Sequence, residues 1–534
     1  MAMDDLIGQL IWGFIGSGEG VEPAERAARE GRLSGVWLLR PEMRSPGETA
    51  KLVNRLQAAS PVPLLVGVDA EAGLGLVMSG ATELPTAMAL GATGDPSFTA
   101  EAAAVTAAEA GACGINTVGA PVLDVNINPS NPIINTRSFG GTPELVGRHG
   151  VAFLEGTERG SSPDARVLPI GKHFPGHGDT RLDSHLQLDT VSQPRERLEA
   201  VELEPFRQAI AGGVPMLMTA HVVYPALDPD PGVPATLSRP ILTDLLRGEL
   251  GFEGVLVTDC MNMHAIARNF DGGDAAVRCV EAGCDLVLTD DLNGAHEALS
   301  QAFQTGRISE ERIREAAGRV RRVKAQIFGE DLRRPAPVSH EEAQANVGSA
   351  AHAEVAKRIA AASVTLVSGR LTTPSSRPLI MATRMDRWFG PTSEEQLRAV
   401  LASVGWEQAE VMMLDAALHG TQINAARKRA QAARWAALLH FNRVQSFDPA
   451  AVATGGGLVA LADEVAAAGV PLTVVSLGSP YALPLFQNSV AKICTYSTCD
   501  ASLQATLEVL MGSSPARGHM PVELDTPPGL QMVG

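Results

Sequence analysis

The chain has 534 residues, 45% of them hydrophobic and 19% charged, so it can bury a large core and is not disordered by composition. It carries 43 Lys and Arg against 60 Asp and Glu. The resulting net charge of −17 argues against a nucleic-acid partner or an anionic membrane surface, because long-range attraction to phosphate would have the wrong sign. The six scattered cysteines do not form a disulfide framework. The acidic N-terminal segment lacks the Lys or Arg of a secretory signal, so we expect a cytoplasmic protein without a membrane span.

Short runs continuous in Val, Ile and Leu recur through the first part of the chain. Such runs are typical of strands buried on both faces, hence of a parallel sheet. They lie at 10–16, 35–39, 63–69, 115–126, 166–174, 215–223, 254–259 and 284–289. Stretches rich in Ala, Glu and Arg, clearest at 22–31, 95–112 and 195–213, predict helices between them. This alternation predicts a TIM-type (β/α)₈ barrel; a doubly wound open sheet is the alternative, but no GxGxxG motif follows the first strand.

The sequence changes character after the last predicted barrel strand. A long helix is expected over 308–328, and a stretch rich in Pro and polar residues follows it. Strand-like runs then alternate again with Ala-rich helices. We therefore predict a catalytic barrel over 1–332, a linker over 333–348, and a second, sandwich-like α/β domain over 349–534.

Several predicted strands end in polar residues that an apolar core would not choose. These are Asp69, Asp124, Asn126, Lys172, His173, His221 and Asp259. In a (β/α)₈ barrel the carboxyl ends of the strands converge on one mouth, where active sites are built. Residues far apart in the sequence are therefore expected to meet in one pocket.

The segment GKHFPGHGDTRLDSHLQLD, 171–189, has the highest density of polar residues. Its Gly and Pro residues predict a loop, and Asp183 and His185 lie two positions apart, on the same side of an extended backbone. The carboxylate can then fix the imidazole tautomer and leave the second ring nitrogen for acid/base chemistry. Asp259, at the end of a buried strand, is the expected partner. A carboxylate facing an acid/base group is the arrangement of a retaining glycosidase.

These residues also carry a family resemblance. KHFPGHG followed by DSH, MTAHVVYPALD at 218–228 and GFEGVLVTD at 251–259 resemble family 3 glycoside hydrolases. The most similar subgroup is the bacterial β-N-acetylglucosaminidases of peptidoglycan recycling. NTRSFG at 135–140 fits the same pattern, and the last part of the chain is similar to the family's second domain.

The resemblance implies a role for each matching residue. Asp259 would be the nucleophile, and His185 the acid/base oriented by Asp183. Five further residues would bind or adjoin the terminal sugar: Asp69, Arg137, Lys172, His173 and Met263. The implied activity is hydrolysis of terminal β-linked N-acetylglucosamine, for example in muropeptides, through a covalent glycosyl-aspartate. Neither a cofactor nor a metal is implied, and both a monomer and a homodimer remain open.

The sequence departs from the family pattern at three positions. Ala72 replaces a glycine, Val77 stands where an arginine is expected, and Cys260 replaces the second aspartate after the nucleophile. The alternatives left open are a β-glucosidase or xylosidase and a glycoside phosphorylase of the same family. Outside that class they are a non-catalytic sugar-binding protein and a metal-dependent barrel hydrolase. The candidate ligands of the last are His173, His177, His185, His221 and Asp259.

Overall fold

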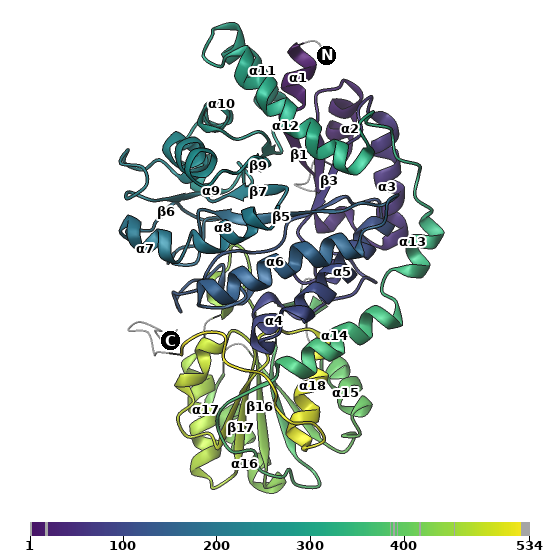
Figure 1. Cartoon of the computed structure of the whole chain (residues 1–534). Coiled ribbons are helices and arrows are strands. Elements are labelled where there is room, and N and C mark those ends of the chain that lie inside the picture. The colour runs from purple at the N-terminus through teal and green to yellow at the C-terminus, as the bar shows by residue number, and fades with distance from the viewer. Residues whose placement is uncertain are drawn as a thin grey trace. The chain divides into compact units, whose positions relative to one another are not determined.

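The computed structural model describes residues 3–15, 20–384, 386–387, 390–391, 393–415, 418–452 and 454–524 (Figure 1). Gly16, at the end of the first predicted strand, lies outside this range, as do 525–534 of the predicted second domain. The chain forms two compact units. The first comprises Met1–Glu83, Thr99–Val125 and Thr142–His352, and the second comprises Leu84–Phe98, Asn126–Gly141 and Ala353–Gly534.

The first unit is built on an eight-stranded sheet in which all pairings are parallel, in the order β10-β1-β2-β3-β4-β5-β7-β9. The strands are β1 (Ile11–Ile15), β2 (Gly35–Leu38), β3 (Leu65–Val68), β4 (Thr117–Val118), β5 (Leu168–Phe174), β7 (Met216–Thr219), β9 (Val255–Val257) and β10 (Val287–Thr289). A parallel bridge between Val257 and Leu286 joins β9 to the start of β10 and closes the sheet. The predicted (β/α)₈ barrel is therefore confirmed.

Helices alternate with these strands. They are α1 (Met3–Gly8), α2 (Glu22–Arg29), α3 (Pro46–Ala59), α5 (Pro96–Ala112), α6 (Pro143–Gly160), α7 (Arg195–Ala200), α8 (Glu204–Ala211), π-helical η5 (Pro240–Glu249), α9 (His264–Ala267), α10 (Gly272–Ala282), α11 (Leu292–Gln304), α12 (Glu310–Phe328) and α13 (His340–Asn346). Their starts follow from local sequence: Asp271 and Ser309, for example, accept from backbone N–H groups in the first turns of α10 and α12. The segment 333–348, expected to be a linker, contains α13, and its Val338 exchanges two hydrogen bonds with Asn54 of α3.

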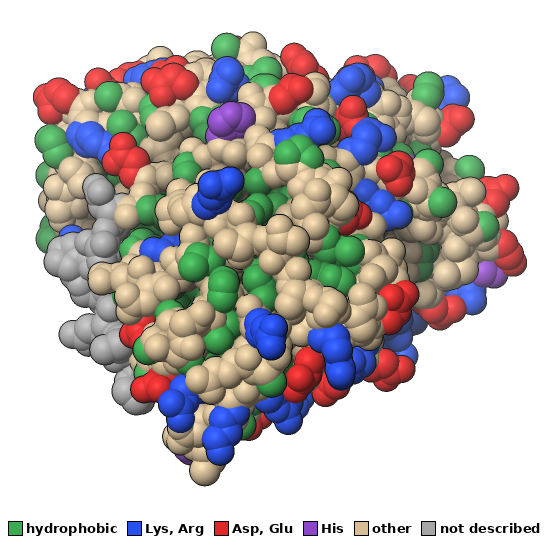
Figure 2. Space-filling model, turned by 90° about the horizontal axis from the view of Figure 1, so that it is seen from below, with side chains coloured by type: hydrophobic (Ala, Val, Ile, Leu, Met, Phe, Trp, Pro, Cys, Tyr) green, Lys and Arg blue, Asp and Glu red, His purple; other side chains and the backbone are tan. Residues whose placement is uncertain are grey.

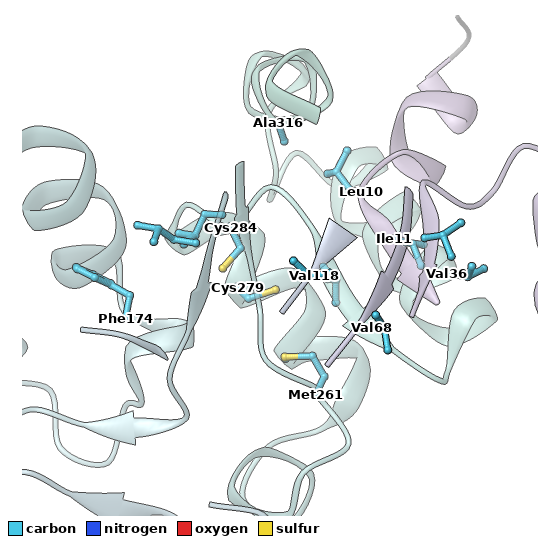
Figure 3. Packing of buried hydrophobic residues seen from close by; sticks show 14 of the residues in the cluster. Leu10, Ile11, Val36, Val68, Val118, Phe174, Met261, Cys279, Cys284 and Ala316 are labelled. Atoms are coloured by element: carbon cyan, nitrogen blue, oxygen red, sulfur yellow. The ribbon is translucent and has the colours of Figure 1, made fainter. Parts of the chain in front are cut away.

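Two hydrophobic clusters hold the barrel together. The outer cluster lies between the strands and the surrounding helices, and Figure 3 shows Val36, Val68 and Val118 of the sheet in it. The inner cluster includes Trp12 and Trp37, whose rings meet edge to face at 5.3 Å. Alternate strand residues supply both clusters, which is why barrel strands read as continuous apolar runs.

The second unit has a six-stranded sheet in the order β11-β18-β17-β16-β12-β15. Its strands are β11 (Thr365–Gly369), β12 (Leu379–Thr383), β15 (Glu410–Leu414), β16 (Ala436–Asn442), β17 (Leu472–Gly478) and β18 (Ala491–Cys494). Only β11 runs antiparallel to its neighbour among these described strands. The main helices are α4 (Ala87–Thr93), α14 (Ala350–Ser363), α15 (Glu394–Ser403), α16 (Gly420–Ala433), α17 (Gly456–Ala467) and α18 (Asp500–Met511). Separate hydrophobic clusters cover the two faces, so the predicted second α/β domain is confirmed as a three-layer sandwich.

Acidic and basic side chains are interspersed over the face that Figure 2 shows. None of the helices in the described ranges combines the length and apolar character needed to span a bilayer.

Candidate active site

Hydrogen bonds and ion pairs link the polar residues at the carboxyl ends of the barrel strands. Lys172, in β5, reaches Asp69 after β3 at 2.6 Å. His173 Nδ1 lies 2.7 Å from Asp124 Oδ2, after β4. His221 Nε2, after β7, lies 3.0 Å from the carbonyl oxygen of Cys260, after β9. These contacts bring polar side chains together at the carboxyl ends of the strands, where a (β/α)₈ barrel has its mouth.

Asp259 follows β9 and is partly exposed. Its Oδ1 accepts a hydrogen bond of 2.7 Å from the backbone N–H of Cys260. Burial raises the pKa of the Asp259 carboxyl, but three imidazoles and this N–H outweigh burial and hold the pKa below its usual value. The imidazoles are those of His221, His173 and His185. An ionised carboxylate in this environment is suited to act as a nucleophile.

The predicted contact between Asp183 and His185 is present. Asp183 Oδ1 lies 2.7 Å from His185 Nδ1 and accepts the backbone N–H of His185 at 2.9 Å. The expected extended backbone is wrong: the segment is a turn, because Leu186 and Gln187 both donate their N–H groups to the carbonyl of Asp183. Asp183 is buried, whereas 22% of the His185 side chain is exposed. An ionised carboxylate only accepts, so Nδ1 carries hydrogen and Nε2 is left for proton transfer.

The loop that carries His185 is hydrogen-bonded to the segment that follows Asp259. The N–H groups of His264 and Ala265, at the start of α9, donate to the carbonyls of His185 and Ser184, both at 3.3 Å. These two backbone contacts hold the acid/base candidate and the nucleophile candidate in one assembly, although 74 positions separate them in the sequence.

His177 fixes the same loop from the other side. Its ring nitrogens lie 2.9 Å from Thr180 Oγ1 and 3.0 Å from Ser184 Oγ, and its backbone N–H donates to Asp124 at 2.6 Å. Sequence reasoning placed His177 among possible metal ligands and did not anticipate this positioning role. In the described part of the chain, no group of three or more His, Cys, Asp or Glu side chains has the arrangement of a metal site.

The Lys172 ammonium is almost completely buried between two carboxylates. It lies 2.6 Å from Asp69 and 2.7 Å from Glu71. The indole N–H of Trp37 also donates to Asp69, at 3.3 Å. The Asp69 side chain remains 42% exposed, so it can still accept hydrogen bonds from a ligand. Glu71 was not predicted as a site residue; its position two residues after Asp69 was the available signal.

Asp124 organises the next strand end. It is fully buried and accepts from the His173 ring at 2.7 Å and from the N–H groups of His173 and His177. Burial raises the pKa of the Asp124 carboxyl, but His173 and then His177 lower it more, and the net pKa is below the usual value. His173 is thereby oriented by Asp124 through Nδ1, which leaves its Nε2 for other contacts.

The two remaining predicted binding residues are Met263 and Arg137. Met263 is buried and precedes α9, where its N–H donates to the carbonyl of Cys260 at 3.1 Å. Arg137 belongs to the second unit, at the end of η3 (Asn135–Arg137), and its guanidinium donates to the carbonyl of Ile133 at 2.8 Å. A contact of either residue with sugar stays a prediction. Val77 is partly buried against the barrel core, and Arg40 donates to the carbonyl of the adjacent Leu76.

Comparisons with known proteins identify the family of the barrel. The family model for the glycosyl hydrolase family 3 N terminal domain matches residues 24–323. Beta-hexosaminidase A of Pseudoalteromonas piscicida is 33% identical over 366 residues, which cover 63% of this chain but only 59% of that protein. A beta-hexosaminidase of Alkalilimnicola ehrlichii is 36% identical over 291 residues, 53% of this chain and 80% of that protein.

A solved structure extends the similarity to both units. It is a glycoside hydrolase family 3 beta-N-acetylglucosaminidase from Paenibacillus sp. str. FPU-7, with a TM-score of 0.88 and 34% identity, and the match covers 99% of this chain and 100% of that chain. The family model alone spans more than half of the sequence and contains Asp69, Lys172, the dyad and Asp259. The chain belongs to glycosyl hydrolase family 3.

Proposed function

We propose that the protein is a retaining exo-β-N-acetylglucosaminidase that removes terminal β-linked N-acetylglucosamine, with muropeptides among its substrates. The observation that carries the proposal is the arrangement of the His185–Asp183 pair and Asp259. Hydrogen bonds from the start of α9 tie the loop of the pair to the segment after Asp259. The similarity to β-hexosaminidases supports the sugar class.

In the first step, the free carboxylate oxygen of Asp259 attacks the anomeric carbon while protonated His185 donates a proton from Nε2 to the leaving oxygen. The Cys260 N–H on Oδ1 leaves Oδ2 to form the new bond. Asp183 stabilises the protonated imidazole before transfer and fixes its ring orientation throughout. The products are the aglycone alcohol and a glycosyl-aspartate ester.

In the second step, neutral His185 takes a proton from water as the water oxygen attacks the anomeric carbon and the aspartate leaves. Two displacements at the same carbon restore its configuration, so the released sugar is the β-anomer. Asp69, Lys172 and His173 supply a carboxylate, an ammonium group and a ring nitrogen, Nε2, for the sugar hydroxyls. Charge-assisted hydrogen bonds of this kind are short and directional.

The direct test is hydrolysis of 4-nitrophenyl glycosides of N-acetylglucosamine, glucose and xylose, each with and without inorganic phosphate. We expect the N-acetylglucosaminide to react fastest, and proton NMR at early times to show β-N-acetylglucosamine. Initial release of the α-anomer would refute retention. A preference for glucose or xylose would refute the sugar assignment, and accumulation of a sugar 1-phosphate would reassign the enzyme as a phosphorylase.

A further inference from the structure

His221 makes two hydrogen bonds at the mouth that the proposed chemistry does not use. It follows β7 and has no exposed surface. Its Nδ1 lies 2.7 Å from Thr236 Oγ1, and its Nε2 lies 3.0 Å from the carbonyl oxygen of Cys260. Its position beside the residue that follows Asp259 makes it a candidate for controlling that carboxylate.

The two partners decide where the ring hydrogens lie. A carbonyl oxygen can only accept, so Nε2 must carry a hydrogen. The Thr236 hydroxyl can donate to Nδ1, or it can accept from Nδ1 and turn its own hydrogen to the carbonyl of Ala220, 3.0 Å away. The Nε2–H contact to Cys260 is therefore kept in both the neutral and the protonated imidazole.

Cys260 is fixed through its backbone on both sides. Its N–H donates to Asp259 Oδ1 at 2.7 Å, and its carbonyl accepts from His221 Nε2 and from the N–H of Met263. The next N–H, that of Met261, donates to the carbonyl of Leu288 in β10 at 2.9 Å. The turn that carries the carboxylate is thus anchored to the strands on either side of β9.

We propose that His221 is a positioning residue for Asp259: by holding the Cys260 carbonyl through Nε2–H, it keeps the Cys260 N–H on Oδ1 and directs Oδ2 toward the anomeric carbon. The inference rests on the proposed function, in which Asp259 is the nucleophile. Electrostatics agree in direction: His221 lowers the pKa of Asp259 more than the other imidazoles do, and burial in turn lowers the pKa of His221, so its charge develops only toward acid pH. The other charged groups near this turn are His173 and His185, which face Asp259, and Asp69 and Asp290, which face Cys260.

The test compares His221→Met, which removes the donor, with His221→Gln, whose amide N–H can reach the same carbonyl. His149→Met is the matched control, because His149 is also fully buried and pairs with a threonine hydroxyl, that of Thr99 at 2.6 Å. The measurements are the pH dependence of kcat/KM on an aryl N-acetylglucosaminide and the melting temperature of each variant.

We expect His221→Met to lower kcat/KM roughly 10- to 100-fold, as misplacement of a reacting group does. We also expect it to move the acid limb to higher pH, since Asp259 loses the imidazole that lowers its pKa most. His221→Gln should recover most of the rate. His149→Met should lower the melting temperature and leave the acid limb in place. An unchanged acid limb in His221→Met, with only a loss of stability like that of the control, would overturn the proposal.

A second measurement separates this inference from the proposed function. Histidine ¹⁵N NMR, with His221→Gln used to identify the signal of His221, should show hydrogen on Nε2 throughout the titration. A ring with hydrogen on Nδ1 alone would overturn the inference even in an active enzyme. If the wild-type protein hydrolyses no glycoside, the proposed function fails, and the NMR result still decides whether His221 holds Cys260.

Discussion

Lys324 offers a prediction whose size follows from the structure. It lies on α12, next to Val323 of the inner barrel cluster, and has almost no exposed surface. Its ammonium donates to Gln9 Oε1 at 2.8 Å, two residues before β1 begins, and among the described residues it forms no ion pair. Burial lowers the pKa of Lys324 from 10.5 to about 7. The folded protein therefore binds this proton more weakly than the unfolded chain does.

The sign of the effect on stability follows directly. Between pH 10.5 and pH 7 the unfolded chain holds more protons at this position than the folded protein does. The contribution of Lys324 to the free energy of unfolding therefore falls as the pH falls through this range, and it becomes constant below pH 7. With about 1.4 kcal/mol for each pKa unit, the cost is about 4 kcal/mol at pH 7 and about 2 kcal/mol at pH 9. Lys324→Met should remove this cost. The same variant should lose about 1–3 kcal/mol of stability at every pH, because Gln9 Oε1 no longer has its hydrogen-bond donor.

The assay is urea unfolding at pH 7 and pH 9, followed by tryptophan fluorescence, to which Trp12 and Trp37 of the inner cluster contribute. The stability gained by Lys324→Met should shrink by about 2 kcal/mol from pH 7 to pH 9. Lys51→Met, which removes an exposed ammonium from α3, is the control and should show no such change. If the free energies of unfolding of Lys324→Met and wild type differed by the same amount at both pH values, the argument that burial lowers the pKa of Lys324 would be refuted.

Three further predictions concern catalysis. Asp259→Ala should reduce turnover by roughly 10⁴-fold or more while circular dichroism and the melting temperature stay near wild type; residual activity within tenfold of wild type would exclude it as nucleophile. His185→Ala should slow alkyl glycosides by roughly 10²–10⁴-fold and nitrophenyl glycosides much less, because proton donation matters most for poor leaving groups; equal losses on both would contradict the acid assignment. Asp183→Asn should act through His185, so the double variant should be little worse than His185→Ala alone, whereas multiplied losses would indicate separate roles.

The barrel could be predicted because its strands are buried on both faces. The run from Leu64 to Val68 is uninterrupted and fully buried, and Asp69 follows it at once. That change from apolar to polar marks a carboxyl strand end, and in a closed parallel barrel every such end belongs to the same mouth. The dyad was predictable for a different reason: Asp183 and His185 are near enough in sequence to meet in almost any loop geometry.

The parts that escaped prediction depend on contacts between distant segments. Asn126 was grouped with the barrel's strand ends, yet it belongs to the second unit and donates to the hydroxyl of Tyr481 at 2.7 Å. The segment 84–98 likewise belongs to the second unit, where Met88 is part of its hydrophobic cluster. Hydrophobic periodicity predicts which face of an element is buried but not which partner covers it. The role of His177 was missed for the same reason, since Ser184 and Asp124 are not distinguishable as its partners from sequence.

Two buried lysines at opposite ends of one barrel show what distinguishes a site from a core. At the carboxyl end, Lys172 lies between Asp69 and Glu71, whose carboxylates compensate its charge. At the amino end, Lys324 has a neutral partner, and burial favours its uncharged form. Both side chains are almost completely buried, and Lys172 has two carboxylates beside it where Lys324 has an amide oxygen. The pairing of a buried ammonium with two carboxylates, one of them still exposed, is the observation that supports Lys172 and Asp69 as candidate sugar-binding residues.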